Sequence, residues 1–167
     1  MEPLINQSPM TQQAEVTYAG FWKRFLAYII DSFILSCASL LIIIPVVITF
    51  GVGAFTQHEI GEEAAMGFLI ALIGAYFVFV VMIIIGHWLY FALMESKKGA
   101  TLGKMALGVI VTDLNGNPIS FGKATGRYFG KILSSLIFCV GYIMAGFTQQ
   151  KQALHDILAG CLVVNKK

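Results

Sequence analysis

The sequence predicts an all-α membrane protein, a small polytopic helical bundle with two to three transmembrane spans and a C-terminal amphipathic helix. Hydrophobic residues make up 57% of the 167 residues and charged residues only 12%, whereas about a quarter of the residues in soluble domains are charged. The mean hydropathy of +0.79 agrees, and two long apolar runs exceed the roughly 20 residues that cross a bilayer. The net charge of +2 is too small to indicate nucleic acid as a partner.

The length allows one domain, which we place at residues 18–165. Residues 1–17 are polar and lack a basic segment at their start, so we interpret them as a disordered cytoplasmic tail rather than a signal peptide. The chain shows no glycine-rich phosphate loop, Ser–His–Asp arrangement or Cys-x-x-Cys motif. We therefore expect no enzymatic activity, no cofactor and no metal. The isolated cysteines are typical of small buried hydrophobic residues: Cys37, Cys139 and Cys161.

The first apolar run, residues 21–50, opens with Trp22 and Arg24 and carries Asp31. Tryptophan is enriched at membrane interfaces, and nine residues at 1.5 Å each place Asp31 roughly 13 Å deeper, near the middle of the bilayer. Ionisable side chains at that depth are costly, so Asp31 must be compensated. We expect Pro45 to kink or end the helix.

The second apolar run covers residues 66–94, and Gly67, Ala71 and Ala75 form a small-residue face suited to close helix packing. The connecting loop, residues 51–65, contains no lysine or arginine, whereas basic residues precede the first run and follow the second. By the positive-inside rule, the N-terminus and the 95–127 connection lie in the cytoplasm. We interpret the histidine and the glutamates of the loop as solvated rather than as ligands of a divalent ion: His58, Glu59, Glu62 and Glu63.

The 95–127 connection contains a mildly apolar stretch, 101–111, followed by Asn115-Gly116, a typical hairpin turn. We expect a short amphipathic segment and a small turn at the inner surface.

A third apolar stretch, residues 126–147, carries two ridges with four-residue spacing. The small ridge permits close helix approach and consists of Gly122, Gly126, Gly130 and Ser134. The basic ridge consists of Lys123, Arg127 and Lys131. One interpretation is an interfacial collar whose side chains reach lipid phosphates. The other is that Arg127 or Lys131 faces inward and meets Asp31.

The C-terminal segment predicts an amphipathic helix. Leu154, Ile157, Leu158, Cys161 and Leu162 follow one face, and Gln152, His155, Asp156 and Ala159 follow the opposite one. We expect this helix to lie on the membrane surface or to dock against the bundle. Three full spans would place it outside the cell. Its lysines favour the inside, which would need a re-entrant turn near Gly141, and we favour this second arrangement.

Four ordered motifs carry a resemblance to the RDD family of small bacterial membrane proteins, which is named for one arginine and two aspartates. They lie at residues 20–31 (GFWKRFLAYIID), 100–108 (ATLGKMALG), 112–122 (TDLNGNPISFG) and 152–160 (QALHDILAG). The resemblance covers residues 18–165 and implies a multi-pass protein of the bacterial inner membrane. On this resemblance, Arg24, Asp31 and Asp156 match the three family residues, with Asp113 as an alternative second aspartate.

These three residues lead to two functional hypotheses. In the first, the cluster moves a cation or proton, as carboxylates do in transporter relays; in the second, it only fixes helix packing and partner binding. Seven residues span about 10 Å along a helix, so Asp31 needs a partner from another segment, with Tyr28 between it and Arg24. We name Tyr28, Arg127, Lys131 and His155 as supporting residues.

His155 and Asp156 point about 100° apart on a helix, which disfavours a catalytic dyad. Two or three spans enclose little volume, so we expect the lipid bilayer and a homo-oligomer or another membrane protein as partners.

Overall fold

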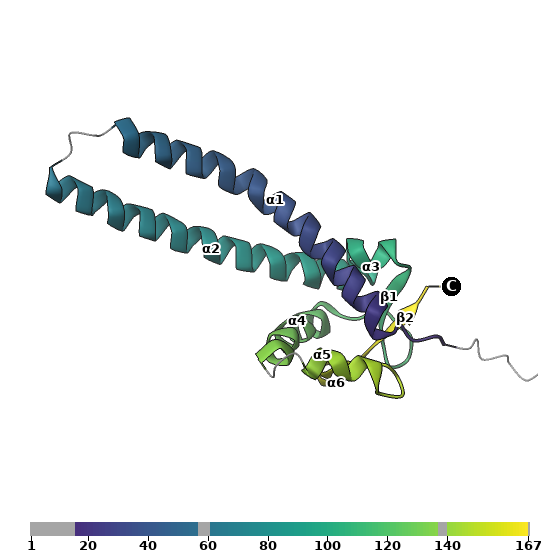
Figure 1. Cartoon of the computed structure of the whole chain (residues 1–167). Helices are drawn as coiled ribbons and strands as arrows, with labels where there is room; N and C mark the ends of the chain where they lie inside the picture. Colours follow the sequence, from purple (N-terminus) through teal and green to yellow (C-terminus); the bar gives the residue numbers. More distant parts are fainter. Residues whose placement is uncertain (1–15, 57–60, 137–139, 167) are drawn as a thin grey trace, which may run out of the picture.

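The computed structural model describes residues 16–56, 61–136 and 140–166. Two long helices, α1 (Phe21–Thr56) and α2 (Glu62–Lys98), form a hairpin whose arms run in opposite directions. The remaining elements gather at the end where α1 begins and α2 finishes (Figure 1). They are α3 (Leu102–Ala106), β1 (Val109–Asp113), α4 (Phe121–Leu136), α5 (Val140–Ile143), the 3-10 helix η1 (Met144–Gly146), α6 (Leu154–Ala159) and β2 (Cys161–Asn165).

Two helices are long and apolar enough to cross a membrane, which confirms the predicted class. The qualifying segments are Phe21–Thr49 and Ala65–Lys98, with mean hydropathies of 2.5 and 3.0. A third span exists only if α4 and the α5–η1 pair, which are bent by 117° relative to each other, count as one. Helix α1 continues through Pro45, whose carbonyl accepts a hydrogen bond from the Thr49 hydroxyl. The prediction that the helix could stop there was therefore wrong.

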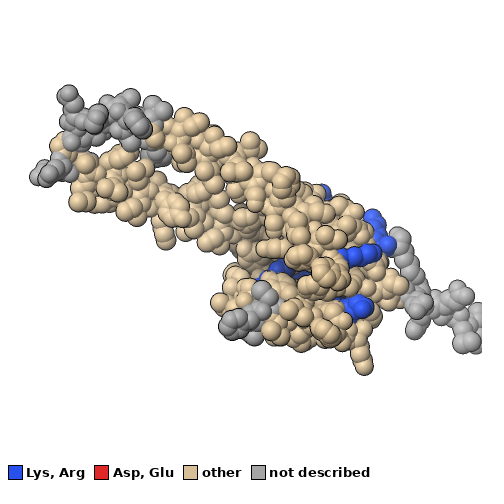
Figure 2. Space-filling view, in the orientation of Figure 1, with Lys and Arg blue, Asp and Glu red and all other residues tan. Residues whose placement is uncertain are grey.

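Charge is concentrated at the end of the hairpin that carries the small elements. Lys and Arg show at this end in Figure 2, and no charged residue shows on the part of the hairpin arms that this view describes. Large apolar side chains along both arms are exposed, such as Leu41, Ile70 and Phe77. Such a surface is stable in lipid but not in water. The predicted loop 51–65 is shorter than expected, because residues 51–56 belong to α1 and residues 62–65 to α2. His58 and Glu59 lie outside the described residues.

The C-terminal segment differs from the predicted continuous helix. Helix α6 ends at Ala159, Gly160 adopts a left-handed conformation with φ 59°, and the chain becomes strand β2. Strand β2 pairs antiparallel with β1, from Val109 opposite Asn165 to Asp113 opposite Cys161. The β-branched Val163 and Val164 suit this strand.

This pairing also determines which segments share one end of the hairpin. Tyr18, just before α1, forms an isolated bridge with Val164 of β2. The approach to α1, the connection after α2 and the C-terminal strand therefore lie together.

The predicted turn at Asn115-Gly116 is present, with Gly116 at φ 85° and the Asp113 carboxylate accepting hydrogen bonds from the backbone of Asn115 and Asn117. After the turn, Pro118 forms one bridge with Thr112. The main partner of β1 is nevertheless β2, because the long-range strand offers a five-residue ladder. A compact core lies between this sheet and the helices α2 and α4, formed by Ala19, Ala92, Val109, Val111, Ile119, Ala124, Cys161 and Val163.

Glycines permit two close approaches in this layer. A Cβ on Gly103 would lie 2.2 Å from the carbonyl oxygen of Ala27, so only glycine lets α3 lie on α1. A Cβ on Gly130 would lie 3.0 Å from the Cβ of His155, where α4 meets α6. Within the predicted small ridge on α4, Gly130 thus makes a contact inside the protein. A Cβ on Gly126, by contrast, would meet nothing within 4 Å. The predicted face at Gly67 likewise meets nothing within 4 Å in the described chain.

Replacing Gly130 with leucine should destabilise the fold by more than about 2 kcal/mol, because the new side chain must displace the backbone of α6. Gly126→Leu is the matched control, since it makes the same change in helix propensity on the same helix but faces open space. Thermal unfolding in detergent measures the difference. Equal melting temperatures for the two variants would contradict this assignment of the contact.

Candidate functional site

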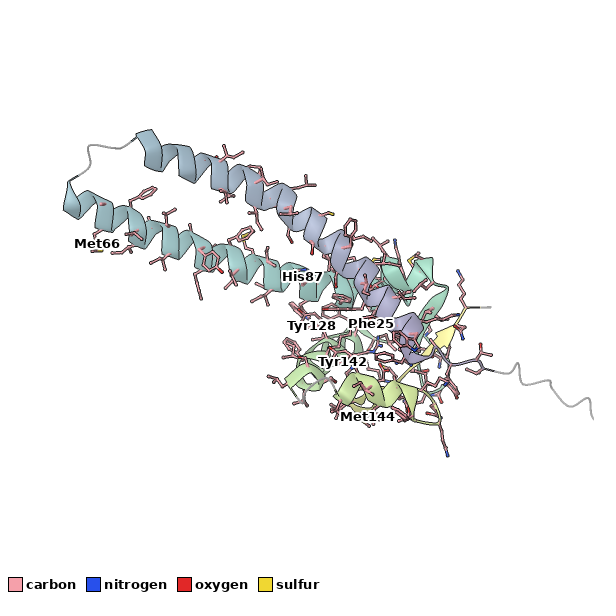
Figure 3. All side chains as sticks on the ribbon, viewed as in Figure 1. Phe25, Met66, His87, Tyr128, Tyr142 and Met144 are labelled. Atoms are coloured by element: carbon pink, nitrogen blue, oxygen red, sulfur yellow. The ribbon has the colours of Figure 1, made fainter. Side chains whose placement is uncertain are left out.

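The predicted charged residues meet where the first turns of α1 lie against α2 and the α4–α6 layer. The labelled side chains of Phe25, Tyr128 and Tyr142 in Figure 3 converge on this junction, whereas Met66 lies at the far end of α2. The site draws its residues from both long helices, from α3, from α4 and from α6. Its geometry therefore depends on packing between segments that are distant in the sequence.

Asp156 on α6 joins α1 to α4. Its Oδ2 accepts a hydrogen bond from Nη1 of Arg24 and another, 3.1 Å long, from the backbone N–H of Ala153. Its Oδ1 accepts a 2.6 Å hydrogen bond from Nε of Arg127. Burial alone would raise the pKa of Asp156, but the positive charges of Arg127 and Arg24 outweigh it and hold that pKa well below its usual range.

Asp156 faces inward because α6 is oriented with its polar side against the protein. Asp156 is 0% and His155 5% exposed, whereas Ile157 and Leu158 are 46% and 59% exposed. The predicted amphipathic helix is thus docked, and its apolar face points outward. This is favourable only where lipid rather than water covers that face.

Glu95, near the end of α2, forms the second centre of the network. Its Oε2 accepts a 2.7 Å hydrogen bond from Nη1 of Arg127, and its Oε1 accepts one of 2.6 Å from Nζ of Lys104. Nζ of Lys131 lies farther away, at 3.6 Å from Oε1. Burial, and then the nearby charge of Arg127, lower the pKa of Lys104 to about 7 although Glu95 opposes the shift.

Asp31 lies at the same junction but belongs to none of the ion pairs among the described residues. It is 1% exposed and accepts hydrogen bonds from the Tyr90 hydroxyl at 2.8 Å, the Thr101 hydroxyl at 2.5 Å and the Gly103 N–H at 2.7 Å. The expected partner from another segment is present, but it is a set of neutral donors. These bonds attach α3 and the end of α2 to α1.

Two expectations about Asp31 therefore need correction. Arg24, which the sequence placed too far from Asp31 for direct contact, pairs with Asp156. Arg127 does face inward, yet it meets Asp156 and Glu95. Tyr28 does not bridge Arg24 and Asp31, since its side chain is 59% exposed and lines a cavity instead.

The basic ridge on α4 is split rather than uniform. Lys123 is exposed, Arg127 is buried, and Lys131 is intermediate, with its Nζ 4.2 Å from the centre of the Phe91 ring. The predicted interfacial position thus fits Lys123 but not Arg127. The guanidinium of Arg127 is buried because Glu95 and Asp156 pair with it.

His155 supports the network from its edge. Its Nδ1 lies 3.3 Å from the Ser134 hydroxyl and its Nε2 lies 3.6 Å from Oδ1 of Asp156. Burial lowers the pKa of His155 to about 3, with Asp156 opposing the shift and Arg127 adding to it. The imidazole is therefore neutral at physiological pH.

A cavity of about 410 Å³ lies beside the network between α1 and the α4–η1 segment. Its charged lining consists of four basic side chains and one carboxylate: Arg24, Lys104, Arg127, Lys131 and Asp31. Aromatic side chains such as Phe21, Phe25 and Phe91 form much of the remaining wall. A site with this lining attracts negative charge and also accepts apolar groups.

Two central residues were absent from the sequence prediction. Glu95 follows an apolar run and precedes Ser96, Lys97 and Lys98, so it resembled an ordinary helix end. Lys104 resembled one more cytoplasmic lysine. One sequence feature could have pointed to Glu95, because it is the only acidic residue between residue 64 and residue 112. Asp113, the alternative second aspartate, instead stabilises the turn at Asn115 and Asn117.

The RDD family profile matches residues 18–160, which include Arg24, Asp31 and Asp156. The chain belongs to the RDD family. Two Bacillus subtilis (strain 168) relatives are similar over nearly their whole lengths. "Uncharacterized protein YxaI" is 39% identical over 89% of this chain and 97% of its own, and "Uncharacterized membrane protein YteJ" is 30% identical over 93% and 88%. "Proline-rich antigen" of Mycobacterium leprae (strain TN) is 22% identical over 81% of this chain and 57% of its own.

No solved structure matches this RDD protein. The structure described above gives the arrangement of the three residues that the resemblance assigns. Arg24 and Asp156 pair directly, and Asp31 holds α3.

Stability should decrease as the pH falls from about 6.5 to about 4, because the unfolded chain protonates His155 whereas the folded pKa is about 3. The expected slope is about 1.4 kcal/mol per pH unit. Below about pH 4, protonation of unfolded Asp156 adds a second loss, since its folded pKa is lowered. In His155→Gln, the free energy of unfolding should change less steeply with pH above pH 4, as measured by thermal unfolding in detergent. An unchanged slope would refute the assignment of this stability loss to His155.

A double-mutant cycle should show that Arg24 and Asp156 act as a pair. Arg24→Ala leaves a buried carboxylate short of one donor and should be strongly destabilising, and Asp156→Asn in the same chain should recover part of the loss. We expect a coupling of about 0.5–3 kcal/mol. Asp31→Asn is the control partner, because it shares no hydrogen bond with Arg24 and should be additive. Coupling of Arg24 to Asp31 but not to Asp156 would contradict the network.

Proposed function

We propose that this RDD protein is a structural or accessory protein of the bacterial inner membrane, whose charged cluster fixes helix packing and presents the apolar hairpin to lipid and to protein partners. One observation carries the proposal. Each of the six carboxylate oxygens of Asp31, Glu95 and Asp156 already accepts a hydrogen bond from within the chain. Buried carboxylates whose oxygens are all hydrogen-bonded are typical of a rigid junction.

The position of the hairpin supports this interpretation. Residues 32–56 of α1 follow the junction, and 25 helical residues are about 37 Å long, enough to cross a bilayer core of about 30 Å. Asp31 could then lie at the boundary of the core, where α3 covers it, rather than in mid-bilayer. The depth of Asp31 remains a prediction.

The same arrangement suggests how the chain is oriented. Lys97 and Lys98 lie in the last turn of α2 and Lys104 lies in α3, and the C-terminal strand pairs with the segment after them. With the N-terminus in the cytoplasm, as the lysine and arginine distribution favours, the C-terminus would lie there too. The exposed apolar arms suit a homo-oligomer or another membrane protein as partner, because they make few contacts with each other.

Transport of a cation or proton is the second candidate, favoured by one observation: Asp31 lines the 410 Å³ cavity. The basic side chains in the same lining count against a cation. A proton carrier would also have to release Asp31 from three donors in each cycle.

Asp31→Asn separates the two functions. For the structural function, the variant should fold with a modest loss, because an amide oxygen can keep one or two of the three hydrogen bonds while its NH₂ group faces a donor. Wild type and variant should then show the same pH-jump flux in proteoliposomes, equal to that of empty vesicles.

Flux in wild-type vesicles that Asp31→Asn abolishes, with folding intact, would refute the structural proposal and support transport. Ser32→Ala is the matched control, because Ser32 is the next residue of α1 and its side chain lines a different cavity, bounded by α1, α2 and α4. Reconstituted protein is compared at equal amounts by gel and by circular dichroism.

A further inference from the structure

The search for further sites leads to the space around Lys131 on α4. This side chain has the weakest pairing of the four cations near the network, with Nζ 3.6 Å from Glu95 and the shorter Glu95 bonds taken by Lys104 and Arg127. It is also 19% exposed, whereas Arg127 is 2% exposed. Lys131 thus retains donors that the protein does not satisfy by a short hydrogen bond to a carboxylate.

The charges near Lys131 do not balance. Glu95 and Asp156 carry two negative charges, and the cations that surround them are Arg24, Lys104, Arg127 and Lys131. Asp31 adds a third carboxylate, because its neutral donors Tyr90, Thr101 and Gly103 leave its negative charge in place. Four cations therefore face three carboxylates. An anion beside Lys131 would restore the balance.

Lys131 lies where two cavities meet. Besides the 410 Å³ cavity, a second of about 510 Å³ adjoins it, and both are lined by Tyr28, Phe91, Lys131, Ser135 and Tyr142. The hydroxyl of Tyr142 donates a 2.9 Å hydrogen bond to the carbonyl of Lys131, which holds α5 at this edge. Figure 3 shows Tyr128 and Tyr142 at the same junction.

The second cavity continues along α1 into its apolar span. Tyr28, Ser32, Leu35 and Ser36 line it at the spacing of one helix face, and eight residues extend about 12 Å along the axis. These residues belong to the candidate span Phe21–Thr49. A ligand with its charge at Lys131 would therefore have room for an apolar part beside α1, which free phosphate does not possess.

We propose that the space around Lys131 binds the phosphate headgroup of an anionic membrane lipid, with the glycerol and first part of an acyl chain along α1. Basic pockets between membrane helices are known to hold anionic headgroups. Lys131 contacts the phosphate, and the aromatic rings of Tyr28 and Phe91 enclose the apolar part. The site does not depend on the proposed structural role, because a transporter could hold the same lipid.

Native mass spectrometry in detergent tests the site with phosphatidylglycerol and with phosphatidylcholine of the same acyl chains. Wild type should retain phosphatidylglycerol preferentially. Lys131→Gln should weaken its binding about tenfold, the effect of one charge-assisted contact. Lys123→Gln is the matched control, because it removes an exposed lysine two turns earlier on the same helix. Equal loss in both variants, or equal binding of the two lipids, would overturn the proposal.

Two further arms keep the test decisive. Ser135→Leu should also weaken phosphatidylglycerol binding, because the larger side chain fills both cavities. Among the described residues, the Ser135 hydroxyl donates to the Ile132 carbonyl of its own helix. This variant answers the question if Lys131→Gln fails to fold, and unchanged binding would count against the site. Inorganic phosphate that displaces the lipid from wild type would show a soluble-anion site instead and refute the lipid proposal.

Discussion

The contact of Asp156 with Arg24 and Arg127 is the interaction on which the rest of the junction depends. One buried carboxylate, 0% exposed, joins the start of α1 to the middle of α4 through α6. Removing a charge from water is costly, and the cost is offset only when good geometry and further hydrogen bonds accompany the pair. Here the Ala153 N–H completes the carboxylate, and Glu95 uses the other end of Arg127. The guanidinium of Arg127 thus connects two acids that come from α2 and α6.

Close backbone approach makes this geometry possible. The carbonyl of Ala27 lies so near Gly103 that no side chain fits between them, and this brings the Gly103 N–H within 2.7 Å of Asp31. At Gly130, the absence of a side chain lets His155 lie against α4, which places the next residue, Asp156, beside Arg127. The glycines and the charged residues therefore act together. The glycines allow the short distances between segments, and the ionic contacts stabilise this packing relative to looser arrangements.

Outside the junction the structure follows a different principle. The arms of α1 and α2 carry exposed leucine, isoleucine and phenylalanine side chains and little that pairs them specifically. In lipid, apolar contact between helices is no better than contact with acyl chains, so association requires small or polar residues. Among the described residues of this RDD protein, the ion pairs lie at one end of the hairpin, and that end is where the helices, α3 and the small sheet hold together. The outward apolar face of α6 continues the exposed apolar surface of the hairpin to this end.

The sequence by itself determined the membrane class, the two long helices, the turn at Asn115-Gly116 and the membership of the RDD family, because composition, run length and turn chemistry are local properties. It also singled out Arg24, Asp31 and Asp156, and it left open whether Arg127 faces inward or lies at the membrane interface. Only the tertiary structure decided how they pair. Arg24 meets Asp156 across 132 positions of the chain, Asp31 binds neutral donors, and Glu95 enters the network from α2. The change from α6 to strand β2 was likewise undetermined locally, since the apolar pattern of residues 154–162 fits a helix until β1 supplies the opposing ladder. Pairing between distant segments depends on which helix faces meet, and a periodicity in one segment carries no information about the face of another.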